Sequence, residues 1–159
     1  MKVRQATSAD APCLSALCMD VQSLHARHHP EFFKAPQNED FAISFFEEML
    51  SDPAVSIFIA EEDGEAVGYI LCKLVERPDN PFTFAVRVLL VDQVSVRPPA
   101  QGQGIGMALM QRAETLAKEC DVLTIQLDSW AFNTSAHTFF EHLVFLNFNF
   151  RFWRHMDGI

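Results

Sequence analysis

A run of glycine and glutamine residues carries the clearest chemical signal in this sequence. It consists of Gln101, Gly102, Gln103, Gly104, Ile105 and Gly106. Because glycine has no Cβ atom, the backbone there can approach a ligand closely. Unpaired N–H groups at a helix start, together with the helix dipole, favour an anion. The run therefore predicts a site for a phosphate or pyrophosphate group.

Two better-known phosphate-binding loops do not fit this run. A dinucleotide loop has the spacing G-x-G-x-x-G, whereas these glycines stand at 102, 104 and 106, with too little chain after them for a doubly wound domain. A nucleotide-triphosphate loop requires Gly-Lys before Ser or Thr, but no lysine stands between Lys73 and Lys118. Both classes of loop are excluded.

The flanking sequence predicts how the run is positioned. Valine and leucine residues over 88–96 are typical of a buried strand, and Pro98 and Pro99 end it because proline cannot donate to a ladder. Apolar residues at three- and four-residue spacing from Ile105 onward predict a helix. The run thus lies between a strand and a helix.

The remainder of the chain alternates further predicted strands and helices, with no internal repeat or linker. Strands are expected over residues 2–7, 55–60, 66–75, 84–96, 122–129 and 148–154. Helices are expected from Thr7 or Ser8 to about His28, after Asn38 or Asp40, after the glycine run, and after Asn133. Asp63-Gly64 predicts the tight turn of an antiparallel hairpin. We therefore expect one mixed α/β domain over residues 1–159.

Composition narrows the function classes. The chain has 159 residues, of which 49% are hydrophobic, as in a globular domain. Its net charge of −9 argues against a nucleic-acid or anionic-membrane partner and suits a cationic amine. No apolar run approaches the ~20 residues of a membrane span, and no signal peptide is evident. The four cysteines are expected to be reduced thiols in a cytoplasmic protein.

Three histidines, His25, His28 and His29, stand close together and raise the hypothesis of a metal site. A metal would require further ligands and supporting partners, and the sequence identifies none. The favoured interpretation is a helix end at which cationic histidines meet the C-terminal dipole. No metal site is predicted.

Two motifs together resemble one protein family. Gln101, Gly104 and Gly106 fit the pattern Gln-x-x-Gly-x-Gly, which resembles the coenzyme A loop of the GNAT acetyltransferase superfamily. A later stretch, Asn133-Thr-Ser-Ala-His-Thr-Phe-Phe-Glu-His-Leu-Val-Phe145, resembles the second signature of that family. The order and separation of the motifs match the family across nearly the whole chain.

The resemblance implies a fold and a donor site. The fold would be a central mixed, mostly antiparallel sheet with splayed fourth and fifth strands and about four helices. The backbone at Val94, Ser95 and Val96 would pair with the pantetheine arm of acetyl-CoA like an added strand. Amides from Gln101 to Gly106 would hold the pyrophosphate. Asn133 would contact the pantetheine side, act as a helix cap, or do both.

Two residues depart from the family pattern. Phe140, in the cofactor site, stands where the family usually has a tyrosine that protonates the leaving thiolate, and phenylalanine has no hydroxyl to donate. His137, Ser129 or Tyr69 would then be the acid, or the thiolate would leave unaided, or turnover would be slow. Val144 replaces the usual glycine before Phe145, so we expect the bend to form without left-handed backbone or elsewhere.

The candidate general base is Asp92. A carboxylate in a valine- and leucine-rich strand is unfavourable to bury without a partner or a purpose. The alternative is that it pairs with Arg87, Arg97 or a backbone N–H group. Asp128 is the second candidate, followed by His25 or His28.

The sequence therefore predicts an acetyl-CoA-dependent N-acetyltransferase that acts by direct attack within a ternary complex. Its acceptor would be a primary amine of a small molecule or peptide. The alternative is a catalytically weak module that binds acyl-CoA and serves in sensing or in assembly. Phe140 favours this alternative. A homodimer is possible through the aromatic residues over 148–154.

Overall fold

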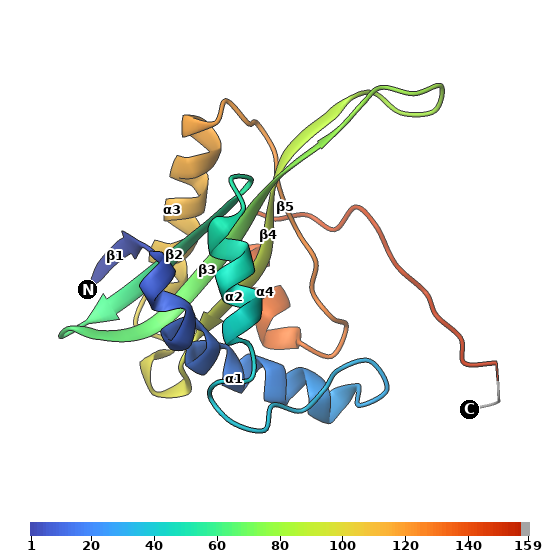
Figure 1. Ribbon diagram of the computed structural model, residues 1–159. Coiled ribbons are helices and arrows are strands. Elements are labelled where there is room, and N and C mark those ends of the chain that lie inside the picture. Colours follow the sequence, from blue (N-terminus) through green and yellow to red (C-terminus); the bar gives the residue numbers. More distant parts are fainter. Residues whose placement is uncertain (157–159) are drawn as a thin grey trace. The chain divides into compact units, whose positions relative to one another are not determined.

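The structure, a computed structural model, describes residues 1–156 of the chain (Figure 1). Internal contacts divide the chain into two compact units, Met1–Asp128 and Ser129–Ile159. Each unit has its own elements and packing. The expectation of a single domain over residues 1–159 stays a prediction.

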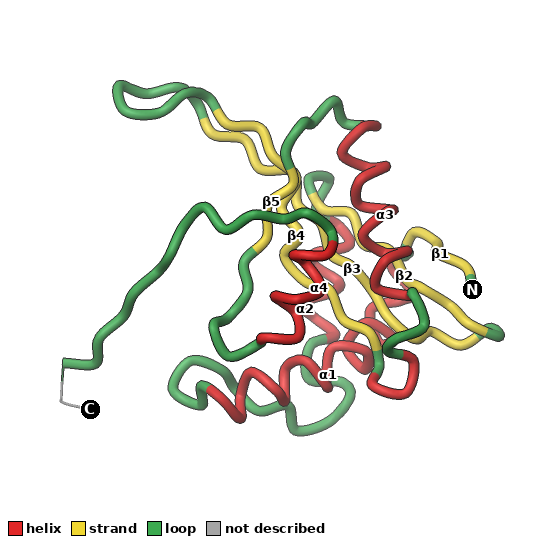
Figure 2. Tube along the Cα trace, turned by 180° about the vertical axis from the view of Figure 1, so that it is seen from behind, coloured by secondary structure: helices red, strands yellow, loops and turns green. Residues whose placement is uncertain are grey.

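The first unit is built on a five-stranded mixed sheet, seen from behind in Figure 2. Its strands, in spatial order, are β1 (Lys2–Gln5), β2 (Val55–Glu62), β3 (Glu65–Arg77), β4 (Val86–Val96) and β5 (Ile125–Leu127). Neighbours are antiparallel except β4 and β5, which are parallel. The predicted mixed, mostly antiparallel sheet is confirmed.

Helices cover both faces of this sheet. They are α1 (Ala11–His28), α2 (Ile43–Ser51) and α3 (Ile105–Glu119). On one face Leu14, Phe46 and Tyr69 belong to a single buried cluster formed by α1, α2, β2 and β3. On the other face the guanidinium of Arg112 on α3 lies 4.2 Å from the ring centroid of Phe58. The alternation of side chains along the strands produces these two packed faces.

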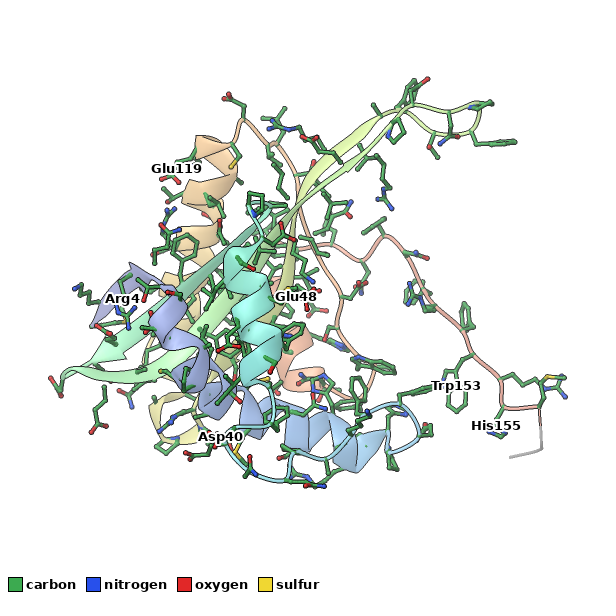
Figure 3. All side chains as sticks on the ribbon, viewed as in Figure 1. Arg4, Asp40, Glu48, Glu119, Trp153 and His155 are labelled. Atoms are coloured by element: carbon green, nitrogen blue, oxygen red, sulfur yellow. The ribbon has the colours of Figure 1, made fainter. Side chains whose placement is uncertain are left out.

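An ionic cluster closes the N-terminal end of the first unit. The Arg4 side chain, labelled in Figure 3, donates to Asp10 at 2.8 and 2.9 Å and to Glu61 at 2.6 Å. Asp10 also accepts from the Thr7 N–H at 2.7 Å, which completes a capping box before α1. The hydrogen bonds from Arg4 hold the pKa of the Asp10 carboxyl well below its usual range.

The β3–β4 hairpin continues as a two-stranded ribbon away from the helices (Figure 1). Its tip lies between Arg77 and Val86, where the side-chain oxygen of Asn80 accepts from the N–H groups of Phe82 and Thr83. Phe82 is 94% exposed. The tip is thus organised by the Asn80 side chain rather than by an apolar cluster.

The second unit contains α4 (Thr134–His142), and its end is a Schellman motif. The N–H of Val144 donates to the Glu141 carbonyl at 2.9 Å, and the N–H of Phe145 donates to the Phe140 carbonyl at 3.0 Å. Val144 has φ +64°. The expectation of a bend without left-handed backbone is therefore wrong, because a β-branched residue occupies the position that usually takes glycine.

Several sequence-based boundaries are corrected. The strand expected over 122–129 is shorter, Ile125–Leu127. The second helix begins at Ile43 because the Asn38 side chain accepts the N–H of Asp40 in a turn that precedes it. No strand is found over 148–154, although aromatic and polar residues alternate there. Alternation indicates strand propensity, but a strand also requires a hydrogen-bonded neighbour, and residues 1–156 provide none for this stretch.

Candidate functional site

The central strand is interrupted by a β-bulge at Asp92. The pairing of β3 with β4 passes from Leu71 opposite Gln93 directly to Cys72 opposite Val91. Asp92 is therefore the extra residue on β4. A bulge locally re-aims side chains and increases strand twist, so it removes Asp92 from the regular in-and-out alternation of the strand.

Beyond the bulge, β5 no longer pairs with β4. The β4–β5 ladder contains three pairs and ends where Val91 faces Leu127, whereas β4 continues to Val96. The edge over Val94, Ser95 and Val96 is thus not covered by β5. The Ser95 hydroxyl donates to the Leu17 carbonyl at 3.4 Å, so its side chain is committed to the α1 face. The backbone of this edge has the geometry to pair with an added extended chain.

The end of β4 leads into the glycine run through a short 3₁₀ turn, Pro98–Ala100. The Gln101 side chain donates to the Val96 carbonyl at 2.9 Å, and the Gln103 side chain donates to the Pro99 carbonyl at 3.2 Å. These two bonds tie the loop to the strand. Gln101 and Gln103 thus shape the loop through their side chains.

Two glycines in the run require left-handed backbone. Gly102 has φ +76° and Gly104, the N-cap of α3, has φ +82°. A Cβ added at either position would meet nothing within 4 Å. The glycines are therefore needed for backbone conformation, and the space beside them is open to a ligand.

The start of α3 presents unpaired donors. The Ala108 N–H donates to the Gly104 carbonyl at 3.0 Å. Within residues 1–156 no hydrogen bond is found for the N–H groups of residues 102–107. With the dipole of this 15-residue helix, these groups form an anion-binding helix start. The predicted helix at the glycines is confirmed, and the residues fit a pyrophosphate group.

Asp92 pairs with Lys73, which is not among the partners expected from the sequence. Its Oδ2 lies 3.0 Å from Lys73 Nζ, and both side chains are about 30% exposed, at 30% and 31%. Arg87 instead pairs with Glu76 at 2.7 Å. A half-exposed carboxylate beside an ammonium group is a competent hydrogen-bond acceptor. Lys73 was missed although it is a charged residue within an apolar strand.

Next to Asp92, Gln93 is held by a buried phenol. The Tyr69 hydroxyl donates to Gln93 Oε1 at 2.7 Å, and Tyr69 is fully buried. Burial raises the pKa of this phenol well above its usual range. Tyr69 is one of the acids that the sequence offers for the leaving thiolate, but its hydroxyl proton is donated to Gln93. The only sequence signal for Gln93 was its position beside Asp92.

Asp128 directly follows the last paired residue of β5, as Asp92 directly follows the last paired residue of β4. The two carboxylates therefore come to the same end of the β4–β5 ladder. Asp128 is exposed. The roles of Asp92 and Asp128 as bases stay predictions.

The remaining candidates lie in the second unit. His137 Nε2 donates to the Trp130 carbonyl at 3.0 Å, which leaves Nδ1 for other contacts. Asn133 caps α4, because its side-chain oxygen accepts the Ala136 N–H at 3.3 Å. Phe140 is 9% exposed, and its ring centroid lies 6.0 Å from that of Phe145. The cap role of Asn133 is confirmed, whereas contacts of these residues with a cofactor stay predictions.

Three of the four cysteine thiols, those of Cys13, Cys18 and Cys72, are poor nucleophiles. Burial raises the pKa of Cys72 to about 12 and raises the pKa of Cys18. Burial also raises the pKa of Cys13. Because the thiolate is the reactive form, these residues do not favour a covalent acyl-cysteine. Within residues 1–156 no cluster of three ligands suited to a metal ion is found.

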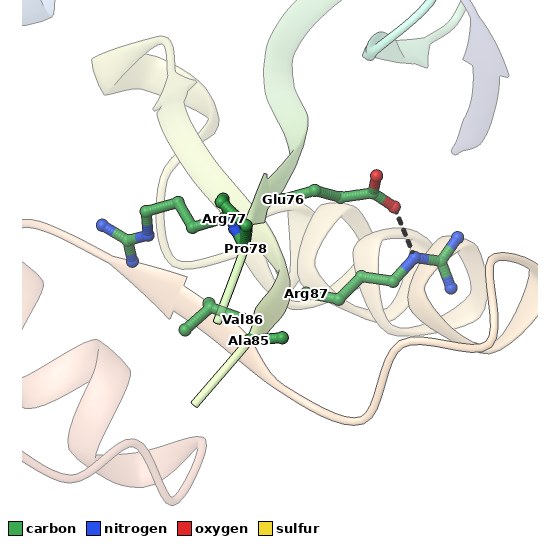
Figure 4. A pocket seen from close by; sticks show the side chains of 6 residues that line it. All are labelled: Glu76, Arg77, Pro78, Ala85, Val86 and Arg87. Atoms are coloured by element: carbon green, nitrogen blue, oxygen red, sulfur yellow. Dashed lines mark hydrogen bonds and ion pairs between the residues drawn. The ribbon is translucent and has the colours of Figure 1, made fainter. Parts of the chain in front are cut away.

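A cavity of about 520 Å³ lies at the opposite end of β4. Figure 4 shows its lining, which includes Arg77, Pro78 and the Glu76–Arg87 ion pair. Val94 lies eight positions after Val86, which belongs to this lining, or roughly 25 Å along the strand. The cavity is therefore not part of the candidate site. No helix among the described residues has the length and apolar character needed to cross a membrane.

Comparison with known proteins identifies similar sequences. A family model described as the acetyltransferase (GNAT) family matches residues 20–145. An uncharacterized N-acetyltransferase from Archaeoglobus fulgidus is 33% identical over 78 residues. That match covers 48% of this chain, and the chain spans about half (50%) of the length of that relative.

Comparison with solved structures finds the same fold. A mutant of the BH1408 protein from Bacillus halodurans aligns with a TM-score of 0.92 at 20% identity, covering 98% of this chain and 99% of the other. The aminoglycoside N-acetyltransferase AAC(6')-Iy, in complex with CoA, aligns with a TM-score of 0.73 at 17% identity, covering 98% and 94%. At these identities the likeness concerns the fold alone.

Proposed function

This chain belongs to the acetyltransferase (GNAT) family, and from that premise we propose that it transfers an acetyl group from acetyl-CoA to a primary amine of a small molecule or peptide. One observation carries the proposal. The edge of β4 that β5 leaves unpaired leads directly into a helix start whose N–H groups have no hydrogen bond within residues 1–156 and whose glycines are open. Acetyl-CoA has two parts that match these two features: an extended thioester arm for the strand edge and a diphosphate for the helix start.

Donor binding would use backbone groups. Val94, Ser95 and Val96 would pair with the pantetheine arm, and the amides from Gln101 to Gly106 would hold the pyrophosphate. The bonds from Gln101 to Val96 and from Gln103 to Pro99 support this arrangement because they fix the loop before any ligand binds. The resemblance to the family further implies that Asn133 and Phe140 contact the cofactor.

Transfer would proceed by direct attack of the amine. The acceptor nitrogen forms a C–N bond to the thioester carbonyl carbon, the C–S bond breaks, and its electron pair leaves on sulfur. Asp92, or Asp128 through water, would take the proton that the nitrogen loses. A backbone N–H near Val94 or Val96 would polarise the carbonyl. The raised pKa of Cys72 and Cys18 supports direct transfer over an acyl-cysteine route.

The purified chain tests this proposal in two measurements. Calorimetry with CoA should show binding, and acetyl-CoA with a panel of primary amines should release free thiol in an amine-dependent manner. Absence of heat with CoA would overturn the proposal. When a substitution in the site weakens binding, Gly64→Ala, in a hairpin turn outside the site, is the control that detects general damage to the protein.

The second candidate function is an acyl-CoA-binding module with little catalysis. Phe140 favours it, because this buried ring packs near Phe145 and offers no proton to a leaving thiolate. His137 is the candidate acid for the enzyme, and it would have to donate through Nδ1 because Nε2 already bonds Trp130. CoA binding without thiol release across the whole panel would select the binding module.

A further inference from the structure

The side-chain amide of Gln93 is oriented by a residue outside the candidate site. Its Oε1 accepts from the Tyr69 hydroxyl at 2.7 Å. Tyr69 cannot easily move, because it is fully buried and its ring packs edge-on to Phe46 at a centroid distance of 5.7 Å. With the oxygen anchored, the Nε2 end of the amide must point away from Tyr69.

The Nε2 group of Gln93 has no hydrogen-bond partner in the described part of the chain. No hydrogen bond from Nε2 is found within residues 1–156, and Gln93 is only half-buried. An amide nitrogen has two N–H donors. If a bound ligand shields these donors from water and offers them no acceptor, binding is less favourable. The amide therefore presents two fixed donors to whatever occupies the space beside it.

Asp92 and Gln93 reach the same face of the sheet although they are consecutive. Asp92 contacts Lys73, and Gln93 contacts Tyr69. Lys73 and Tyr69 are four residues apart on β3, so their side chains share one face. Regular alternation would place Asp92 and Gln93 on opposite faces, and the bulge at Asp92 removes it. A carboxylate acceptor and an amide donor thus stand side by side.

We propose that Gln93 is a specificity-determining residue that selects a particular class of primary amine. These amines carry a hydrogen-bonding oxygen on the carbon atom next to the one that bears the nitrogen, or one bond farther away. Amino alcohols and α-amino amides are examples. The amine nitrogen donates to the free oxygen of Asp92, and the neighbouring oxygen of the acceptor accepts from Gln93 Nε2. Tyr69 is the positioning residue that holds the amide in this orientation. The inference rests on the proposed acetyl transfer and names the acceptor class of the same site.

The experiment compares ethanolamine with n-propylamine. The two amines are of similar size, but only ethanolamine carries the oxygen. The ratio of their kcat/KM values is measured by thiol release in the full chain, in Gln93→Leu and in Gln93→Glu. We expect the wild-type chain to prefer ethanolamine by about 10-fold. Gln93→Leu should bring the ratio to about 1 through the KM of ethanolamine, with propylamine changed less than about 2-fold.

The positioning role of Tyr69 has its own readout. Tyr69→Phe keeps the ring and frees the amide, so the ratio should fall between the wild-type and Gln93→Leu values, again through KM rather than kcat. Gln93→Glu, which replaces donors by acceptors, should lower the ratio below that of Gln93→Leu. An unchanged ratio in Gln93→Leu would overturn the inference, whether or not Tyr69→Phe is stably folded.

A binding measurement separates failure of this inference from failure of the proposed function. Calorimetry titrates ethanolamine into the chain saturated with CoA, for the wild type and Gln93→Leu. Equal affinities would overturn the role of Gln93 even if neither amine is acetylated. Absence of CoA binding in the wild-type chain would instead reject the proposed function.

Discussion

The hydroxyl of Tyr69 on β3 donates a hydrogen bond of 2.7 Å to the side-chain carbonyl oxygen of Gln93 on β4. This bond joins the fully buried cluster beneath α1 and α2 to the strand that carries the candidate base. A change in core packing around Tyr69 would therefore alter the candidate site without touching a ligand. The same bond makes the protonation of Tyr69 relevant to both stability and acceptor binding.

Tyr69 should remain protonated far into the alkaline range. It is the only tyrosine in the chain, so phenolate absorbance reports it alone. Burial raises the pKa of Tyr69 well above that of an unfolded chain, about 10. Its contribution to stability is complete below pH ~10 and is lost as the pH rises above that value, because the unfolded state ionises first. Spectrophotometric titration should show phenolate appearing together with loss of ellipticity, and a simple titration near pH 10 in the folded protein would contradict this.

Replacing Asp10 by asparagine should destabilise the first unit in a pH-dependent manner. Hydrogen bonds from Arg4 lower the pKa of Asp10, so its contribution is present above an unfolded-state pKa of about 3.9 and is lost as the pH falls below that value. Asp10→Asn should lower the free energy of unfolding by about 1–2 kcal/mol at pH 7, and by less at pH ~3.

The matched control for Asp10 is Glu76→Gln. Glu76 forms an ion pair with Arg87 at 2.7 Å, but the two side chains are 61% and 47% exposed. Solvent screens such a pair, so its loss should change stability by less than about 0.5 kcal/mol. Urea unfolding at both pH values measures the two variants. Equal losses in Asp10→Asn and Glu76→Gln would contradict the role assigned to the Arg4 cluster.

Val144→Gly should stabilise the second unit. Val144 has φ +64°, and left-handed backbone is unfavourable by about 1–2 kcal/mol for a residue with a Cβ atom. Its side chain is 80% exposed, so little burial is lost. After the greater unfolded-state entropy of glycine is subtracted, a net gain of about 0.5–1 kcal/mol is expected.

Tryptophan fluorescence measures this change, because Trp130 and Trp153 both lie in the second unit. Thr138→Gly, at an exposed site inside α4, is the control and should lose about 0.5–1 kcal/mol. If Val144→Gly destabilises the protein as much as Thr138→Gly does, the left-handed conformation of Val144 stores no strain.

The elements around the glycine run could be predicted because their signals are local. Each signal acts within a few residues of the element that it determines. The strand ends at Pro98 and Pro99, glycines occupy the positions of positive φ at 102 and 104, and the apolar spacing of the helix begins at Ile105. The Asn133 cap is equally local. Such signals depend on backbone conformation and do not require knowledge of distant neighbours.

The polar arrangement beside the base could not be predicted, because it depends on strand register. Lys73 meets Asp92, and Tyr69 meets Gln93, only because a bulge shifts the pairing of β3 and β4 by one residue. No residue near Asp92 marks a bulge in the sequence. The Schellman motif at Val144 was missed for the opposite reason: a strong local preference for glycine is overridden by the hydrogen bonds of Val144 and Phe145.

Gly104→Ala should weaken CoA binding while its control does not. Gly104 and Gly64 have φ +82° and +84°, and an added Cβ meets nothing within 4 Å at either. Both alanine variants should therefore lose about 1 kcal/mol of stability. Only Gly104 caps the helix whose N–H groups would hold the pyrophosphate, so only its variant should raise the Kd for CoA, by about 10-fold. Calorimetry with CoA decides, and equal Kd values in the two variants would contradict the assignment of the loop.

Asp92 and Lys73 should have separable kinetic effects. Asp92→Asn keeps the shape of the side chain but cannot accept a proton, so kcat/KM for an amine should fall by about 10²–10³-fold. Asp128→Asn tests the second candidate in the same assay and should have a smaller effect. If Asp128→Asn is the more damaging of the two, the base is assigned to β5 instead of β4.

Lys73→Met should act on KM instead. The Lys73 ammonium occupies one oxygen of Asp92 at 3.0 Å and carries the same charge as an incoming protonated amine, so it competes with the acceptor. Removing it should lower the KM for amines several-fold while leaving kcat within about 2-fold and the Kd for CoA unchanged. Arg87→Met removes another strand-borne cation from an ion pair, the one with Glu76, and is the matched control. A higher KM in Lys73→Met would mean that Lys73 helps to bind the acceptor, and that the acceptor carries an anionic group.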